Sequence, residues 1–206
     1  MAFDFKKGYK GLYLPKNTPS ILTVPPMDYV AVRGSGDPNA PGGPYQQAVS
    51  VLYAVSYALK MSYRGGRQIE GFFEYVVPPL EGFWQGWEAG GDKSGLRWIS
   101  AIRLPDFVTR ADLDWAVEEA ARKKGLDCSA AELLTLDEGL CVQIMHLGSY
   151  DDEPASVALM DRYLAENGYQ TDMGGPRLHH EIYLSDPRKT PPERRKTVLR
   201  HPIRKI

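Results

Sequence analysis

The residue types best suited to chemistry occur together in one short β-rich run near the C-terminal end, His179-His180-Glu181-Ile182-Tyr183. Alternation along a strand places His179, Glu181 and Tyr183 on one face, with His180 and Ile182 on the other. A carboxylate on a central strand is costly unless it is paired or hydrogen-bonded. Glu181 is therefore either a structural glutamate satisfied by Tyr or Arg neighbours, or the base of an aromatic pocket that attracts a planar cation or positions a water.

The other candidate chemistries are weaker. His179 and His180 cannot both bind one metal ion from regular β geometry, because adjacent strand residues point to opposite faces. Cys128 and Cys141 lack partners at metal-ligand spacing, so we interpret them as buried free thiols. The run 34–36 resembles the start of a phosphate loop but lacks the following Lys and Ser or Thr. We expect no metal, no cofactor and no nucleophilic catalysis.

The elements that position these residues begin with a strand from Asp28 to Arg33, followed by a turn-rich stretch at 34–43. Apolar residues spaced by three and four predict an amphipathic helix over 44–62, which stops at Gly65 and Gly66. Two β-rich runs, 69–77 and 96–104, follow around a long loop that contains 78–84. The first part of the chain therefore predicts a βαββ unit.

A similar order recurs in the second part. Thr109 and Asp112 can cap a helix that runs to Gly125. After a link at 126–138, residues 140–147 form a predicted strand, a helix runs from the acidic start at 151–154 to Asn167, and 179–185 form a predicted last strand. We expect the helices to cover the Ile182 face of that strand. The simplest interpretation is a duplicated α+β domain.

Composition sets the broad class. The 206 residues carry a formal net charge of −1 with 43% hydrophobic and 25% charged residues, which argues against disorder and coiled coils. No apolar window is long enough to span a bilayer, and the first residues are too charged for a signal peptide, so we expect a cytoplasmic protein that contacts no membrane. The basic stretch at 187–206 is interpreted as a solvated tail, and we expect no nucleic-acid partner.

Seven segments in order resemble the stand-alone GyrI-like small-molecule-binding proteins: GSGDPN at 34–39, LYAVSY at 52–57, PLEGFW at 79–84, AIRLPDFVT at 101–109, VQIMHLG at 142–148, YDDEP at 150–154 and HEIYLSDP at 180–187. The resemblance implies tandem βαββ repeats related by a pseudo-twofold axis, with helices on one side and a ligand pocket at the junction of the halves. The segments are then a lead-in arm at 1–27, a first repeat at 28–108, a helix and link at 109–139, a second repeat at 140–186 and the tail at 187–206.

The same resemblance implies an aromatic cage with a central glutamate, and Glu181 is the matching position. Some stand-alone members of the family are cyclopropanoid cyclopropyl hydrolases, which add water to DNA-alkylating compounds. No helix-turn-helix precedes the domain, which favours this stand-alone group over the regulators. One departure is Trp84-Gln85, where many relatives are expected to have two consecutive tryptophans. The missing ring leaves the substrate open.

The predicted function is binding of planar aromatic or cationic xenobiotics, together with cyclopropane hydrolysis. Glu181 is the candidate catalytic residue, and a Tyr hydroxyl is the expected donor to the ligand carbonyl. The alternatives are a drug-sequestering protein and a gyrase-inhibitor-type interaction partner. Monomer and homodimer both stay open. The candidate ligand-binding residues, some of which core packing alone would explain, are Tyr53, Tyr57, Tyr75, Trp84, Trp98, His146, His179 and Tyr183.

Overall fold

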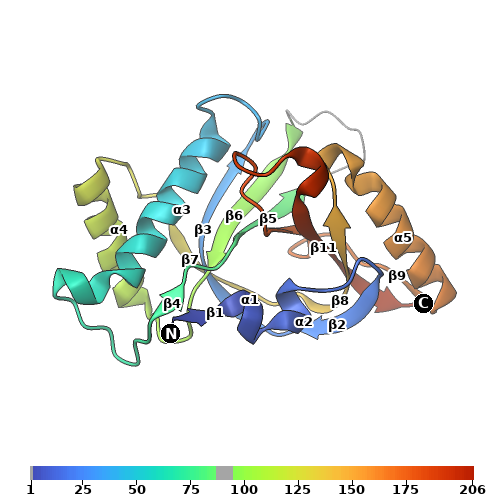
Figure 1. Cartoon of the computed structure of the whole chain (residues 1–206), viewed down its shortest axis with the longest axis horizontal. Coiled ribbons are helices and arrows are strands. Elements are labelled where there is room, and N and C mark those ends of the chain that lie inside the picture. The colour runs from blue at the N-terminus through green and yellow to red at the C-terminus, as the bar shows by residue number, and fades with distance from the viewer. Residues whose placement is uncertain (1, 87–94) are drawn as a thin grey trace.

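An antiparallel sheet forms the centre of the protein, whose computed structural model describes residues 2–86 and 95–206 (Figure 1). In these residues eight strands follow the order β2-β8-β11-β10-β5-β6-β3-β7, and β9 pairs with β11. The strand bounds are β2 Ser20–Val24, β3 Met27–Ser35, β5 Leu80–Gln85, β6 Arg97–Arg103, β7 Glu132–Leu136, β8 Gly139–Leu147, β9 Tyr169–Thr171, β10 His179–Tyr183 and β11 Lys196–Lys205.

The two halves of the sheet have the same order of elements. One half runs β3, helix α3 (Pro44–Lys60), β5, β6, and the other runs β8, helix α5 (Glu153–Glu166), β10, β11. The sheet order β8-β11-β10 is mirrored by β5-β6-β3, and the two inner strands β10 and β5 pair at the junction. The α+β class is confirmed, and superposition of the halves about a pseudo-twofold axis stays a prediction.

The helices begin and end where the local chemistry predicts. Pro44 stands in the first turn of α3, where its missing N–H costs nothing. Helix α4 (Arg110–Lys124) opens on a capping box between Thr109 and Asp112 and ends at Gly125, whose φ is 64°. Helix α4 packs beside α3, and both belong to the core around Leu52.

One predicted strand and one predicted loop in the first half are wrong. The run 69–77 contains only the short β4 (Tyr75–Val76), which pairs with β1 (Phe3–Asp4), whereas the segment expected as a loop contains β5. The aromatic residues of 69–77 pack around Phe107 instead of extending into the sheet. Strand β7 lies in the predicted link 126–138, at the sheet edge beside β3.

The C-terminal stretch is a central strand and not a solvated tail. Strand β11 lies between β8 and β10, and residues 197–203 are buried. The irregular segment 184–195, which includes the short 3-10 helix η4 (Pro192–Arg194), connects β10 to β11. The sequence expectation failed because Arg200 and His201 read as solvated residues, while in the fold their polar groups are satisfied inside the protein.

Helices α3 and α5 cover the Glu181 face of the sheet, which corrects the expectation that they cover the Ile182 face. Strand register places Val32, Gly82, Glu181, Leu199 and Ile144 in one row. Val32 belongs to the core under α3, and Leu199 and Ile144 belong to the core under α5. In the view of Figure 1, α3 lies to the left of the central strands and α5 to their right. Glu181 therefore lies between them.

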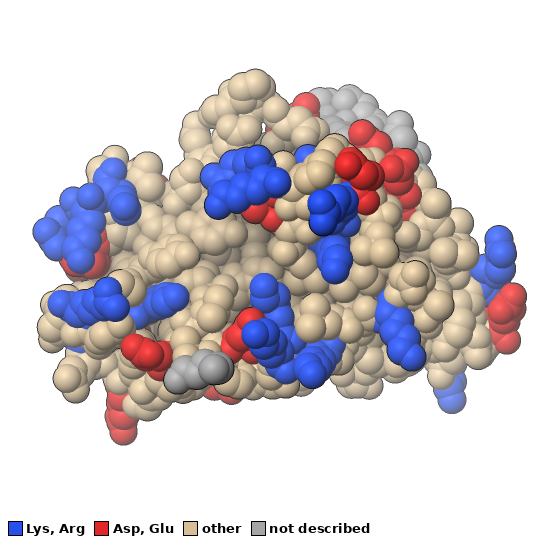
Figure 2. All heavy atoms as spheres, viewed as in Figure 1, with Lys and Arg blue, Asp and Glu red and all other residues tan. Residues whose placement is uncertain are grey.

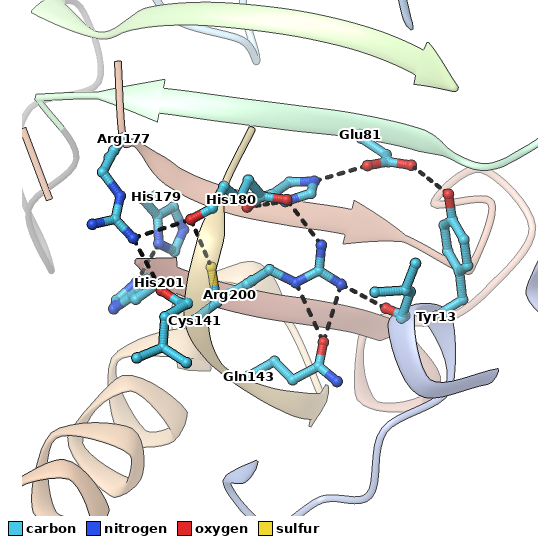
Figure 3. Close-up of polar contacts among 12 residues, drawn as sticks. Tyr13, Glu81, Cys141, Gln143, Arg177, His179, His180, Arg200 and His201 are labelled. Atoms are coloured by element: carbon cyan, nitrogen blue, oxygen red, sulfur yellow. Dashed lines mark hydrogen bonds and ion pairs between the residues drawn. The ribbon is translucent and has the colours of Figure 1, made fainter. Parts of the chain in front are cut away.

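The N-terminal arm covers the opposite face. Phe5 of helix α1 (Phe5–Gly8) and Tyr13 of helix α2 (Lys10–Tyr13) pack against Ile182. Beneath them a chain of buried polar side chains crosses the sheet, as Figure 3 shows. Arg200 donates to Glu138 at 3.0 Å and to the Leu12 carbonyl at 2.7 Å. Alternation within β10 thus separates a candidate site on one face from a buried polar network on the other.

Neither the helices nor the surface charge indicates a membrane-spanning segment or a single charged surface in the part of the protein described. No helix among the described residues is both long and apolar enough to cross a membrane. On the face shown in Figure 2, Lys and Arg side chains form several separate groups with Asp and Glu among them. That face therefore carries no single continuous basic surface.

Candidate functional site

The candidate site is built around Glu181 at the middle of β10. Glu181 stands opposite Gly82 of β5 on one side and Leu199 of β11 on the other. Its side chain is only 6% exposed, so its charge must be met by the protein. Glu181 lies between α3 and α5 at the junction of the two halves, where the family resemblance implies a ligand pocket.

Both carboxylate oxygens of Glu181 have hydrogen-bond partners. His179 Nε2 lies 2.9 Å from Oε1, and the Tyr183 hydroxyl donates to Oε2 at 2.7 Å. On its other side His179 Nδ1 lies 2.6 Å from Nε2 of His201. Each carboxylate oxygen can accept two hydrogen bonds, so Glu181 keeps acceptor capacity for a ligand or a water.

Burial determines the protonation states of His201 and Tyr183. Burial and the neighbouring His179 lower the pKa of His201 to about 3, so His201 is neutral near pH 7. Burial, and then the charge of Glu181, raise the pKa of Tyr183 well above its usual value, so its hydroxyl keeps its proton. With Glu181 ionised, the consistent assignment has His201 donating to His179 and His179 donating to Glu181.

Aromatic rings form one wall of the site. The indole N–H of Trp84 donates to the Tyr183 hydroxyl at 3.1 Å. Tyr45, in the first turn of α3, stacks on Trp84 with ring centroids 5.5 Å apart, and meets Trp98 edge-on at 5.1 Å. Gly82 makes this arrangement possible, because a Cβ there would lie 2.7 Å from Trp84 Nε1 and 2.9 Å from the Tyr183 hydroxyl oxygen.

A second buried carboxylate lies beside Glu181. Glu153, at the start of α5, offers a carboxylate oxygen that lies within 4.8 Å of ligand atoms of His179 and Glu181. One carboxylate pair and one imidazole make a donor set that a divalent cation accepts. His179 and Glu181 already share a hydrogen bond, and the expectation that no metal binds stays a prediction.

The structure brings together about half of the residues expected at the site. Glu181, His179, Tyr183 and Trp84 are linked by hydrogen bonds, and Trp98 adjoins them through Tyr45. Strand alternation had indicated three of them, His179, Glu181 and Tyr183. Their roles in binding stay proposals.

The other four expected residues lie elsewhere. Tyr53 and Tyr57 are 37% and 51% exposed on α3, because they fall outside its buried stripe. Tyr75 belongs to the core on the opposite face of the sheet. His146 is buried, but its two ring nitrogens contact Ser156 Oγ at 2.9 Å and the Ser149 carbonyl at 2.8 Å, so it ties α5 to β8.

Sequence reasoning missed Tyr45, Tyr150, Glu153 and His201. Tyr45 stood in the predicted helix stripe and was interpreted as core, and His201 stood in the segment predicted as a tail. Tyr150, in the 3-10 helix η3 (Tyr150–Asp152), meets Tyr183 edge-on at 5.8 Å, and the Arg195 guanidinium lies over its ring at 5.3 Å. The acidic run before α5 signalled a helix start, but nothing local placed Glu153 beside Glu181.

A surface depression lies on the other face of the sheet. Its volume is about 620 Å³, and its walls include Phe5, Tyr9 and Phe73. The carboxylates at its rim, Glu74 and Asp106, are exposed, so water screens their charge. The buried carboxylate makes Glu181 the stronger candidate site.

Comparisons with known proteins identify the family of the chain. The model of the GyrI-like small molecule binding domain matches residues 17–204. A structure described as a hydrolase from Listeria innocua is 45% identical, with a TM-score of 0.91, and the alignment covers 98% of this chain and 100% of that one. A second Listeria innocua structure, described as an uncharacterized conserved protein, is also 45% identical with the same coverage and a TM-score of 0.92.

A more distant likeness concerns the fold alone. The C-terminal domain of EcmrR is 10% identical, with a TM-score of 0.54, and the alignment covers 92% of this chain and 98% of that one. Among curated proteins, none matches this chain.

Proposed function

This chain belongs to the family of GyrI-like small-molecule-binding domains, and from that membership and the geometry around Glu181 we propose that it binds planar aromatic, preferably cationic, compounds and hydrolyses the cyclopropane of cyclopropanoid DNA-alkylating compounds. The observation that carries the proposal is a buried carboxylate with two fixed hydrogen-bond donors beside a wall of aromatic rings. Rings stack on a planar ligand, and the carboxylate attracts positive charge or aligns a water.

The proposed reaction needs little from the protein beyond positioning. In a cyclopropane conjugated to a dienone, a water oxygen bonds to the ring carbon while one cyclopropane C–C bond breaks. The electron pair of that bond moves into the dienone, which becomes a phenolate. Glu181 accepts the water proton, and that proton later reaches the phenolate, so the sum is addition of one water.

The hydrogen bonds to Glu181 suit this role. His179 and Tyr183 hold the Glu181 carboxylate in one orientation. A water that donates a hydrogen bond to this carboxylate therefore approaches the ligand at a fixed angle. The Listeria innocua structure described as a hydrolase, at 45% identity over nearly the whole chain, favours an enzyme. Sequestration without turnover is the second candidate, since the same rings and the same carboxylate bind a drug with no water path.

Mass spectrometry of the small molecule tests the proposal. The purified protein is incubated with a cyclopropanoid alkylator, and we expect a product heavier by one water, formed faster than in buffer. Glu181→Gln should lower turnover by about 10² to 10⁴ and keep most of the affinity for the neutral compound, because a positioned general base contributes that much.

Two other outcomes are informative. Protection of DNA from the alkylator without any hydrated product over hours would leave sequestration as the function. Equal turnover by the wild type and Glu181→Gln would remove Glu181 from the chemistry.

A further inference from the structure

The indole N–H of Trp98 is a buried donor with no hydrogen-bond partner among the described residues. Trp98 is only 3% exposed, and its Nε1 contacts no acceptor in the part of the chain that the structure describes. Buried donors in native proteins are nearly always paired, because an unpaired one loses its bond to water and gains nothing in return. An acceptor atom on a bound ligand would satisfy this N–H.

Two other donors in the ring wall already have acceptors among the described residues. The Tyr183 hydroxyl proton goes to Glu181, and the Trp84 indole N–H goes to the Tyr183 oxygen. The Tyr183 hydroxyl already donates to Glu181, and the wider expectation that a Tyr hydroxyl donates to a ligand carbonyl stays a prediction.

The register of the sheet sets how far the Trp98 backbone lies from that of Glu181, and the six-membered ring of Trp98 lies over Gly34 of β3. Trp98 pairs with Trp84, and Trp84 pairs with His179, so all three point to the helix-covered face in one row. Strand β6 lies two strands from β10, which is roughly 10 Å across the sheet. Tyr45 contacts both Trp84 and Trp98, so the rings form a continuous surface over that interval.

We propose that the Trp98 indole N–H is the hydrogen-bond donor to a carbonyl oxygen of the bound ligand, so that the site selects planar polycyclic ketones over the corresponding hydrocarbons. The inference rests on the proposed function and specifies its substrate class. The ligand carries its carbonyl toward β6 and its electron-poor or cationic end toward Glu181. In the hydrolysis, the same N–H stabilises the negative charge that develops on that oxygen.

A matched pair of probes tests this assignment. Equilibrium dialysis gives the affinities of 9-fluorenone and fluorene, which differ by the carbonyl, for wild type, Trp98→Phe and Trp115→Phe. We expect the wild type to prefer fluorenone about tenfold or more, because the ketone satisfies the buried donor. Trp98→Phe keeps a ring and removes the N–H, so its preference should fall to about twofold or less.

Trp115 is the control tryptophan, since it belongs to α4 and has Arg67 over its ring. Trp115→Phe should keep the wild-type preference, and thermal unfolding of each variant reports whether it is folded. Proflavine, a planar cation without a carbonyl, separates the two proposals. If proflavine binds but the fluorenone preference is absent or survives Trp98→Phe, the Trp98 assignment is wrong and the proposed binding function stands. If none of the three compounds binds the wild type, both proposals fall.

Discussion

At the scale of single residues, the site depends on the absence of a side chain at position 82. Gly82 faces Glu181 across the β5–β10 junction, and the Trp84 and Tyr183 side chains meet above it. Trp84 donates to the Tyr183 hydroxyl, which in turn donates to the Glu181 carboxylate. The space left by Gly82 therefore determines how the carboxylate is held. Any Cβ at this position moves at least one of the two side chains.

Gly82→Ala should therefore damage the site more than the fold. The added Cβ would meet the Trp84 and Tyr183 polar atoms at 2.7 and 2.9 Å, which is too close for ordinary contact. We expect destabilisation of about 1 to 3 kcal/mol, as for overpacking, and loss of proflavine affinity of about tenfold or more. Urea unfolding and dye titration measure the two effects.

Gly65→Ala is the matched control. A methyl carbon added at Gly65 would have no described atom within 4 Å, so this change should leave dye affinity as in the wild type. Wild-type dye affinity in Gly82→Ala would show that the Trp84–Tyr183 contact does not shape the site.

At the scale of elements, the N-terminal arm is held to the sheet by the buried polar network. Gln143 donates to the Gly11 carbonyl at 2.6 Å, and the Tyr13 hydroxyl donates to Glu81 at 3.2 Å. His180 joins Glu81 and Glu138, at 2.9 Å from each. Buried charges contribute stability only while each keeps its partner, so this network is sensitive to protonation.

The pH dependence follows from Glu138. Burial alone would raise its pKa, but His180 and Arg200 outweigh burial and lower the pKa to about 2 from 4.5. A lowered carboxyl pKa contributes stability that is present above the ordinary value and lost as the pH falls toward the folded value. The wild type should therefore lose stability progressively as the pH falls from about 4.5 toward 2.

Glu138→Gln should cost about 3 to 5 kcal/mol near neutral pH, because it leaves the buried Arg200 guanidinium without its carboxylate. It should also flatten the acid limb of the stability curve. Urea unfolding at a series of pH values measures both, with Glu132→Gln as control, since the Arg33–Glu132 pair is exposed and contributes about 1 kcal/mol or less. An acid limb as steep as that of the wild type would show that another carboxylate dominates.

The pKa of His180 is shifted in the opposite direction from that of Glu138. Burial alone would lower its pKa, but Glu138 and Glu81 raise it above 6.5. Its contribution is complete below 6.5 and is lost as the pH rises through the raised folded value. Tyr29, Cys141 and Arg177 also face this region, and the carboxylates of Glu81 and Glu138 provide its negative charge.

At the scale of the whole molecule, the site lies where the two halves meet. Strand β10 belongs to one half and β5 to the other, while α3 and α5 approach the Glu181 face from either side. A ligand held between Glu181 and the ring wall contacts both halves. Its binding energy therefore adds to the stability of the entire fold.

Proflavine should raise the unfolding temperature accordingly. At a concentration of about 100 Kd, binding adds about 2.7 kcal/mol, which for a chain of this length is roughly 5 to 10 °C. Glu181→Gln at the same dye concentration should show about half that shift, because losing one cation–carboxylate contact lowers affinity about tenfold. Calorimetry measures both shifts, and identical shifts in the two proteins would place the dye away from Glu181.

Local sequence patterns were sufficient for several parts of this protein. Alternation along 179–183 placed His179, Glu181 and Tyr183 on one face, and the periodicity and caps of 44–62 and 109–125 predicted α3 and α4 within a few residues. The family resemblance, carried by seven ordered segments, is confirmed by the match over 17–204. The strand face and the two helices are predictable locally because the backbone hydrogen bonds of a helix and the alternation of side chains along a strand repeat every few residues.

Only the tertiary structure decided which face the helices cover, which strand lies beside β10, and which distant groups reach Glu181. Alternation defines two faces of a strand but not which one packs on a helix, since that choice depends on the total apolar area buried by all elements together. Strand β11 carries Arg200 and His201 into the centre because partners from β8, β10 and the N-terminal arm satisfy them there. Tyr45, Glu153 and His201 come to the site from three separate elements, and pairing over such sequence distances leaves no local pattern to read.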